Sequence, residues 1–141
     1  MPIKSTLISL ILIAAVVVAS GCAPKKKPSK PSPQPATPQQ VQEIRNAYFR
    51  AYPDSRVGVV IATLKHANGN FVAVGEVSGS EFRVGETVTF VDAKQRVLTT
   101  GTVVRVLPDS VHVALDPPRG GGREPGVGDV MVKLPFGATT L

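Results

Sequence analysis

The hydrophobic period of the chain changes at Pro53, and this change constrains the fold more than any other feature. Before Pro53, apolar residues recur every three or four positions, as on one face of a helix. After it, short Val-rich runs alternate apolar and polar residues, and turn residues separate the runs. The runs occupy residues 56–65, 71–77, 86–92, 97–107, 111–115 and 129–134. We therefore predict a mainly β fold, a small antiparallel barrel of about six or seven strands preceded by one short α-helix.

The barrel region contains a weak internal repeat. Residues 59–90 align with residues 102–134, and each half ends in a Val-Gly-acid triplet that leads into a strand. Gly85-Glu86 and Gly128-Asp129 occupy equivalent places in the two halves. A glycine permits a positive φ, and the carboxylate after it can accept hydrogen bonds from nearby backbone amides. We expect each pair to hold a tight turn at the start of a strand.

This repeated triplet resembles the Gly-Asp box of the cradle-loop barrel families, in which two halves interlock about a pseudo-twofold axis. The resemblance covers residues 56–134, and its first copy has Glu86 in place of the aspartate. It implies a barrel with internal pseudo-twofold symmetry. The strand order also resembles small barrels of flagellar and other envelope assembly proteins. If the repeat arose by chance, the alternative is an SH3-like or translation-factor-like barrel.

Strict alternation assigns side chains to the barrel core. We expect Phe71, Phe82 and Leu98 to close its ends. The predicted core residues are Val57, Val59, Ile61, Val72, Val74, Val88, Phe90, Val104, Val106, Val111, Val113, Val130 and Val132.

The predicted helix spans residues 38–52. Thr37 can cap it, Pro38 suits its first turn, and Gln40 stands three residues after Thr37 as in a capping box. Its apolar face comprises Val41, Ile44, Tyr48 and Ala51. A stripe this narrow does not stabilise an isolated helix, so we expect it to pack on the barrel. Binding of a separate partner is the alternative.

Residues 1–21 are predicted to be an export signal. Lys4 precedes an apolar stretch from Leu7 to Val18, which ends in small residues and is shorter than the roughly 20 residues of a membrane-spanning helix. The sequence Ala19-Ser20-Gly21-Cys22 resembles the lipobox of bacterial lipoproteins. The resemblance implies cleavage before Cys22 and transfer of diacylglycerol to its thiol. An ordinary secretory signal with an incidental cysteine is the alternative.

Two further features describe the region after the signal. An alanine after the modified cysteine resembles lipoproteins sorted to the outer membrane, which favours a position facing the periplasm over the inner membrane. Residues 22–37 are rich in proline and lysine, so they form an extended tether rather than a packed segment. Its lysines either contact anionic headgroups or keep the tether soluble. The barrel domain is assigned to residues 53–135 and a tail to 136–141.

The charge distribution excludes nucleic acid as an expected partner. The chain has a net charge of +6. Between residues 53 and 141, however, the basic and acidic side chains are equal in number, so the excess lies in the signal, tether and helix. A nucleic-acid-binding domain needs basic side chains concentrated on its folded surface.

Residue types that support catalysis or metal binding are sparse. His66 and His112 are placed in a turn and on an outward strand face, so we do not expect them to meet. We predict no metal site, no cofactor and no catalytic residue. The Gly-rich loop 116–126, which contains Arg119 and Arg123, is either a mobile connection or a partner-binding loop.

These observations favour a membrane-anchored envelope lipoprotein whose barrel is not an enzyme. The barrel would bind or help assemble another envelope component, either a protein or the cell wall. The alternative is a small enzyme or ligand carrier with its pocket in the barrel mouth.

Overall fold

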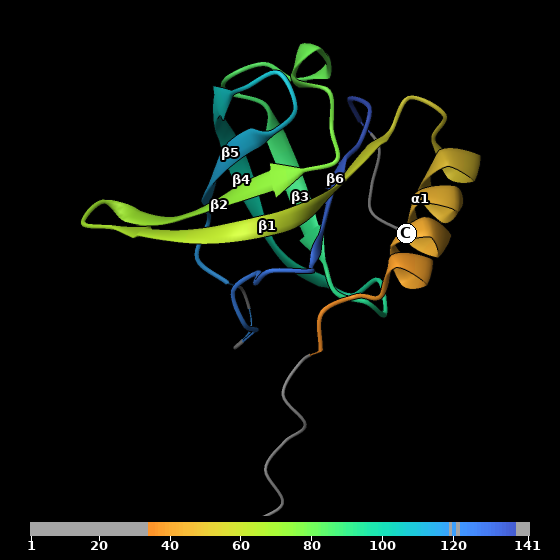
Figure 1. Cartoon of the computed structure of the whole chain (residues 1–141), viewed down its shortest axis with the longest axis horizontal. Helices are drawn as coiled ribbons and strands as arrows, with labels where there is room; N and C mark the ends of the chain where they lie inside the picture. The colour runs from red at the N-terminus through yellow and green to blue at the C-terminus, as the bar shows by residue number, and fades with distance from the viewer. Residues whose placement is uncertain (1–33, 119, 121, 138–141) are drawn as a thin grey trace, which may run out of the picture. The chain divides into compact units, whose positions relative to one another are not determined.

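The computed structural model describes residues 34–118, 120 and 122–137. The predicted signal (1–21), the tether up to residue 33, Arg119 and the last four residues of the tail lie outside this part. The elements are α1 (Pro38–Ala51), β1 (Arg56–His66), β2 (Gly69–Gly75), the 3-10 turn η1 (Gly79–Glu81), β3 (Thr87–Val91), β4 (Val97–Val106), β5 (Val111–Leu115) and β6 (Val130–Lys133). The strands form a closed antiparallel barrel in the order β1-β2-β5-β4-β3-β6 (Figure 1). The predicted fold class is confirmed.

The strand order has the symmetry that the repeat predicts. If β1 is exchanged with β4, β2 with β5 and β3 with β6, strands that are neighbours in the ring remain neighbours. The irregularities match as well, because β1 has a bulge between Val60 and Ala62, and β4 has one between Val103 and Arg105. The two halves therefore repeat the connectivity and the bulge in the first strand of each half. The irregularity between Phe90 and Val91 of β3 has no counterpart in the pairing of β6 with β1.

The burial of residues on β1 and β4 corrects part of the predicted core. Ile61 and Val104 are 53% and 41% exposed, whereas their neighbours Val60 and Val103 are fully buried. A bulge places two successive residues opposite one residue of the partner strand, so the alternation of faces changes phase there. On β4, alternation carried back from Val106 through the bulge therefore selects Val104 instead of Val103. On β1 the predicted phase was inverted from the start, because Ile61 shares the outer face with Val57 and Val59, and Val60 points inward.

The barrel interior is filled by a single cluster of large side chains. The remaining predicted core residues on β2, β3 and β5 are buried there, and Met131 of β6 joins them. Phe82 is buried in the same cluster and Leu98 packs against it, as predicted. The buried members are Val60, Val72, Val74, Phe82, Val88, Phe90, Val103, Val111, Val113 and Met131.

Two equivalent glycines allow the strands to approach closely. A Cβ atom at Gly58 would lie 2.6 Å from Cγ1 of Val74, and one at Gly101 would lie 2.6 Å from Cγ1 of Val113. Contacts this short require the neighbour or the backbone to move. The absence of a side chain at these glycines therefore lets a valine of the paired strand pack against the backbone within each hairpin.

Helix α1 covers the outer face of β1 and β6. Thr37 and Gln40 form the predicted capping box, and Val41, Ile44 and Tyr48 are buried. Their partners on the barrel include Val57, Val91, Val130 and Val132, so these strand residues are buried under the helix and not inside the barrel. The predicted packing of the helix on the barrel is confirmed, but Ala51, its last residue, is exposed and does not belong to the buried face.

Candidate functional site

The two Gly-acid turns have the same geometry. Gly85 and Gly128 have φ values of 94° and 90°, a region that favours glycine. The N–H of Gly85 donates to the carbonyl of Val103 at 2.8 Å, and the N–H of Gly128 donates to that of Val60 at 2.9 Å. Each turn is thus bonded to a strand of the other half, directly before the bulge of that strand.

The second turn contains a buried ion pair. Asp129 is 2% exposed and accepts a hydrogen bond from the N–H of Gly126 at 2.7 Å. The guanidinium of Arg123 donates to both carboxylate oxygens, at 2.5 and 2.8 Å. Hydrogen bonding to Asp129 raises the pKa of Arg123 above its ordinary value, against the opposing effect of burial. Arg123 therefore stabilises this turn, and its guanidinium is not available to a partner at this position.

The first turn repeats this arrangement in a more exposed form. The N–H of Arg83 donates to Glu86 at 2.9 Å, and the Nζ of Lys133 lies 2.8 Å from the same carboxylate. Burial raises the pKa of Glu86, but the hydrogen bonds from Lys133 and Arg83 outweigh it and lower the pKa below its ordinary value of 4.5. Both Gly-acid pairs are thus occupied in the folding of the barrel.

The two hairpins of the barrel differ in length. Thr63 pairs with Val72, and the equivalent pair in the second half is Val106 with Val111. The second hairpin turns directly after that pair, whereas the first continues through three more pairs before its turn. This extension projects from the barrel at the left of Figure 1. Its additional pairs are Leu64 with Phe71, Lys65 with Asn70 and His66 with Gly69.

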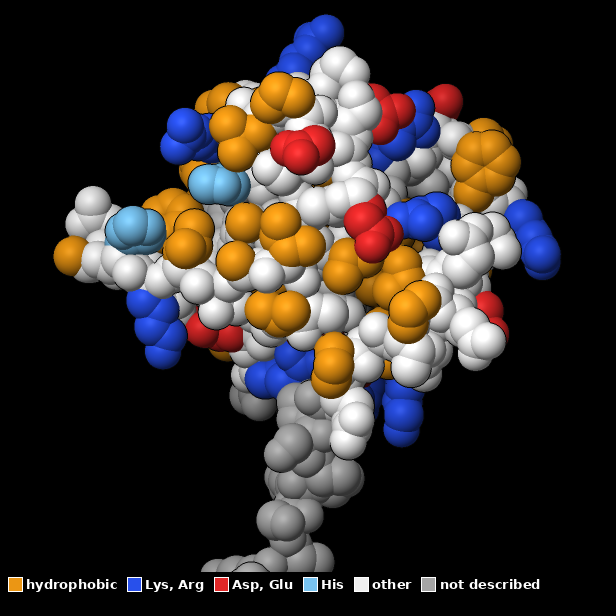
Figure 2. Space-filling view, in the orientation of Figure 1, with side chains coloured by type: hydrophobic (Ala, Val, Ile, Leu, Met, Phe, Trp, Pro, Cys, Tyr) orange, Lys and Arg blue, Asp and Glu red, His pale blue; other side chains and the backbone are white. Residues whose placement is uncertain are grey.

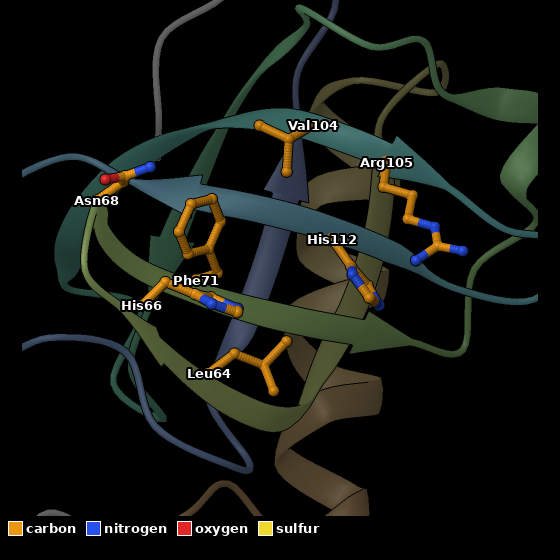
Figure 3. Close-up of a pocket in the computed structure, with 7 residues that line it drawn as sticks. All are labelled: Leu64, His66, Asn68, Phe71, Val104, Arg105 and His112. Carbon is orange, nitrogen blue, oxygen red and sulfur yellow. The ribbon is translucent and has the colours of Figure 1, made fainter.

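A hollow of about 320 Å³ lies between this extension and the outer face of β4 and β5, and we call it the overhang hollow (Figure 3). The ring of His66 meets the ring of Phe71 edge to face, with 5.2 Å between their centroids. The residues that line the overhang hollow are Leu64, His66, Asn68, Phe71, Val104, Arg105 and His112.

The overhang hollow corrects one expectation about a single residue. His66 and His112, which were not expected to meet, line the same hollow from different strands. Phe71 was expected to close an end of the barrel, but it lies on the outer face. The unequal spacing of the repeat was the signal for this site, because eight residues separate Thr63 from Val72 and only four separate Val106 from Val111.

The lining combines apolar surface with nitrogen-bearing groups. No carboxylate is among its residues. The backbone of Arg105 pairs with His112 in the sheet, but its guanidinium has no hydrogen bond or ion pair with any residue that the structure describes. Hydrophobic side chains gather over this face in Figure 2. Val104 lines the hollow and is 41% exposed. The arrangement suits a ligand that has both an apolar group and a negative charge.

Other kinds of site are not found in the part of the chain that the structure describes. There, no group of three or more His, Cys, Asp or Glu residues is placed to hold a metal ion. None of the helices described there has the length and hydrophobicity to cross a membrane. Cys22 and Arg119 lie outside the described residues.

No protein-family model, curated protein or solved structure matches this chain.

Proposed function

We propose that this protein is a lipid-anchored module of the cell envelope that binds or helps assemble another envelope component and is not an enzyme. The observation that carries the proposal is the position of the only cysteine. Cys22 ends an apolar export signal in a lipobox-like sequence and begins a Pro/Lys-rich tether. In an oxidising compartment an unmodified exposed thiol is reactive, whereas a lipidated one is an anchor.

The tether sets the reach of the anchored domain. Acyl chains contribute about 0.8 kcal/mol per buried methylene, and two chains are enough for stable anchoring. A proline-rich segment of roughly 15 residues spans about 45 Å when extended, at about 3.1 Å per residue. A barrel held at that distance from the outer membrane would reach components of the periplasm. Its partner would be an envelope protein or the cell wall, and not a nucleic acid.

Two properties of the barrel support binding over catalysis. The acidic side chains of its two equivalent turns, Glu86 and Asp129, are engaged by Lys133 and Arg123. The interior is filled by buried side chains such as Phe90 and Met131, whereas the overhang hollow opens on the outside. This supports binding at the outer face over the alternative of a ligand carried in the barrel mouth.

Substitution of Cys22 tests the anchor. Cells that produce the Cys22→Ala protein should incorporate no labelled palmitate into it, and it should not fractionate with membranes as the mature wild-type protein does. Ser32→Ala, a change in the tether outside the lipobox-like sequence, should leave both properties unchanged. Membrane retention of Cys22→Ala without lipid label would contradict the proposal.

Crosslinking in intact cells tests the binding role. One dominant protein or cell-wall partner supports the proposed module. A protein that is not crosslinked and is recovered with a small molecule inside its barrel supports the alternative.

A further inference from the structure

The extension of the first hairpin is not needed to close the barrel. The equivalent hairpin of the second half closes the ring without it, with Val106 and Val111 as its last pair. The extension nevertheless presents an aromatic ring and an imidazole, from Phe71 and His66, on one side of a hollow. Side chains of this kind on an added segment are better explained by binding than by folding.

We infer that the overhang hollow is a docking site for a segment of a partner protein in which an acidic side chain neighbours an aliphatic or aromatic one. The inference deepens the proposed function and rests on it in one respect, because it assumes that the barrel's role is to bind a partner. The chemistry of the partner segment follows from the hollow alone.

The negative charge of the partner follows from Arg105. Among the described Lys and Arg residues, Arg45, Arg56, Arg96, Arg123 and Lys133 pair with carboxylates, whereas Arg50, Lys65, Arg83, Lys94 and Arg105 do not. Of the unpaired ones, Arg105 is the one that lines the hollow. Arg105 lines the hollow without such a partner among the described residues, and no carboxylate lines the hollow beside it. A guanidinium binds a carboxylate through two parallel hydrogen bonds, and these charge-assisted bonds are stronger than neutral ones.

The apolar part of the partner follows from the rest of the lining. Leu64, Phe71 and Val104 supply apolar surface that one or two side chains of the partner could contact. In Figure 3 the ring of Phe71 and the side chain of Leu64 lie on the hairpin, across the hollow from Val104. An aliphatic or aromatic side chain placed between them would lose its contact with water while its acidic neighbour meets Arg105.

A protein segment fits this surface better than a membrane or a small molecule does. The hollow is open, so it cannot enclose a free ligand as a typical small-molecule pocket does. Ile61, which is 53% exposed on β1, adds apolar surface that a larger partner would cover. Binding to anionic lipids usually requires several basic residues together, whereas Arg105 is the only Lys or Arg in the lining.

Fluorescence polarisation with short synthetic peptides tests the inference on the full chain, solubilised in a non-ionic detergent. The probe is a fluorescein-labelled peptide of alternating glutamate and phenylalanine. One comparison peptide has glutamine in place of glutamate, and another has alanine in place of phenylalanine. We expect saturable binding of the first peptide and at least about tenfold weaker binding of each comparison peptide.

Matched variants locate the binding. Arg105→Gln should raise the Kd of the acidic peptide at least about tenfold. Arg50→Gln removes the same charge from an exposed position on α1 and should change the Kd less than about twofold. Phe71→Ala should weaken binding, whereas Phe49→Ala, which removes a 60% exposed ring from α1, should not. Arg105 is exposed, so its substitution tests the site even if Phe71→Ala unfolds the hairpin.

Several results would overturn the inference. These are absence of binding by the acidic peptide, equal binding of the glutamine peptide, and equal effects of Arg105→Gln and Arg50→Gln. Displacement of the peptide by inorganic phosphate or by phosphatidylglycerol vesicles at similar occupancy would instead assign the hollow to a free anion or a lipid headgroup. None of these measurements depends on acylation of Cys22, so failure of the anchor and failure of the docking site are separate outcomes.

Discussion

Replacing Asp129 with alanine should destabilise the barrel more than the equivalent replacement of Glu86. The two carboxylates hold equivalent turns, each through one backbone N–H and one basic side chain. They differ in burial, because the side chain of Asp129 is 3% exposed and that of Glu86 is 29% exposed. The repeat therefore provides an internal comparison of the same contact in two environments.

The magnitudes follow from this difference. Asp129→Ala removes a charged acceptor from the N–H of Gly126, which costs about 1.5 to 3 kcal/mol. It also leaves Arg123 without its partner, but that side chain is 30% exposed and can regain water, so we add at most about 1 kcal/mol. For Glu86→Ala, water can replace both lost contacts, and we expect a cost of about 0.5 to 1.5 kcal/mol.

Urea unfolding followed by far-ultraviolet circular dichroism measures this comparison. With m near 2 kcal/mol/M, a difference of about 1 to 2 kcal/mol separates the midpoints of the two variants by roughly 0.5 to 1 M. Asp109→Ala, at an exposed turn position, should stay within about 0.5 kcal/mol of the wild type. Equal midpoints for the two variants, or a larger loss for Glu86→Ala, would refute the argument from burial. An unchanged midpoint in both would refute the role of the carboxylates in the turns.

Three further outcomes are expected. Val60→Ala should lower the free energy of unfolding by about 2 kcal/mol, and Ile61→Ser should lower it by less than about 0.5 kcal/mol. The reverse order by urea unfolding would contradict the inward position of Val60. Gly58→Ala should cost about 1 to 3 kcal/mol because its Cβ would lie 2.6 Å from Cγ1 of Val74, and an unchanged midpoint would exclude this close contact. Because folding lowers the pKa of Glu86, its stabilisation is present above the ordinary value of 4.5 and is lost as the pH falls through the lowered pKa. The Tm of Glu86→Gln should therefore fall less on acidification than that of the wild type, and equal falls would contradict this.

Local signals were sufficient to predict much of the fold. Thr37, Pro38 and Gln40 define the start of α1 through contacts within one turn, so no distant residue is needed. The symmetry of the ring agrees with the repeat, but the order of the strands does not follow from it, because a ring in chain order would have the same symmetry. Turn residues such as Gly85 and Gly128 mark the start of the third strand in each half, β3 and β6.

The bulges and the candidate site depend on contacts that the local pattern does not contain. Val60 and Ile61 are both suitable for a core, and only the pairing with β2 and β6 decides which one points inward. The unequal spacing of the repeat indicates the longer hairpin, but it does not show that Phe71 of this hairpin and Arg105 of the other line one hollow. The same limit applies to α1, which buries strand residues that alternation places inside the barrel.

Side chains at equivalent positions of the two halves report which surfaces are covered. Under α1, Val57 pairs with Val132 and Val59 with Val130, and the equivalent pairs in the other half are Thr100 with Thr89 and Thr102 with Thr87. The same backbone thus carries valine where a helix covers it and threonine where none does. By this comparison, an uncovered outer face should be polar. The face around the overhang hollow has Ile61, Leu64 and Phe71 instead, and no element of the described chain covers the hollow. This departure from the threonine pattern is what a face that binds a partner would show.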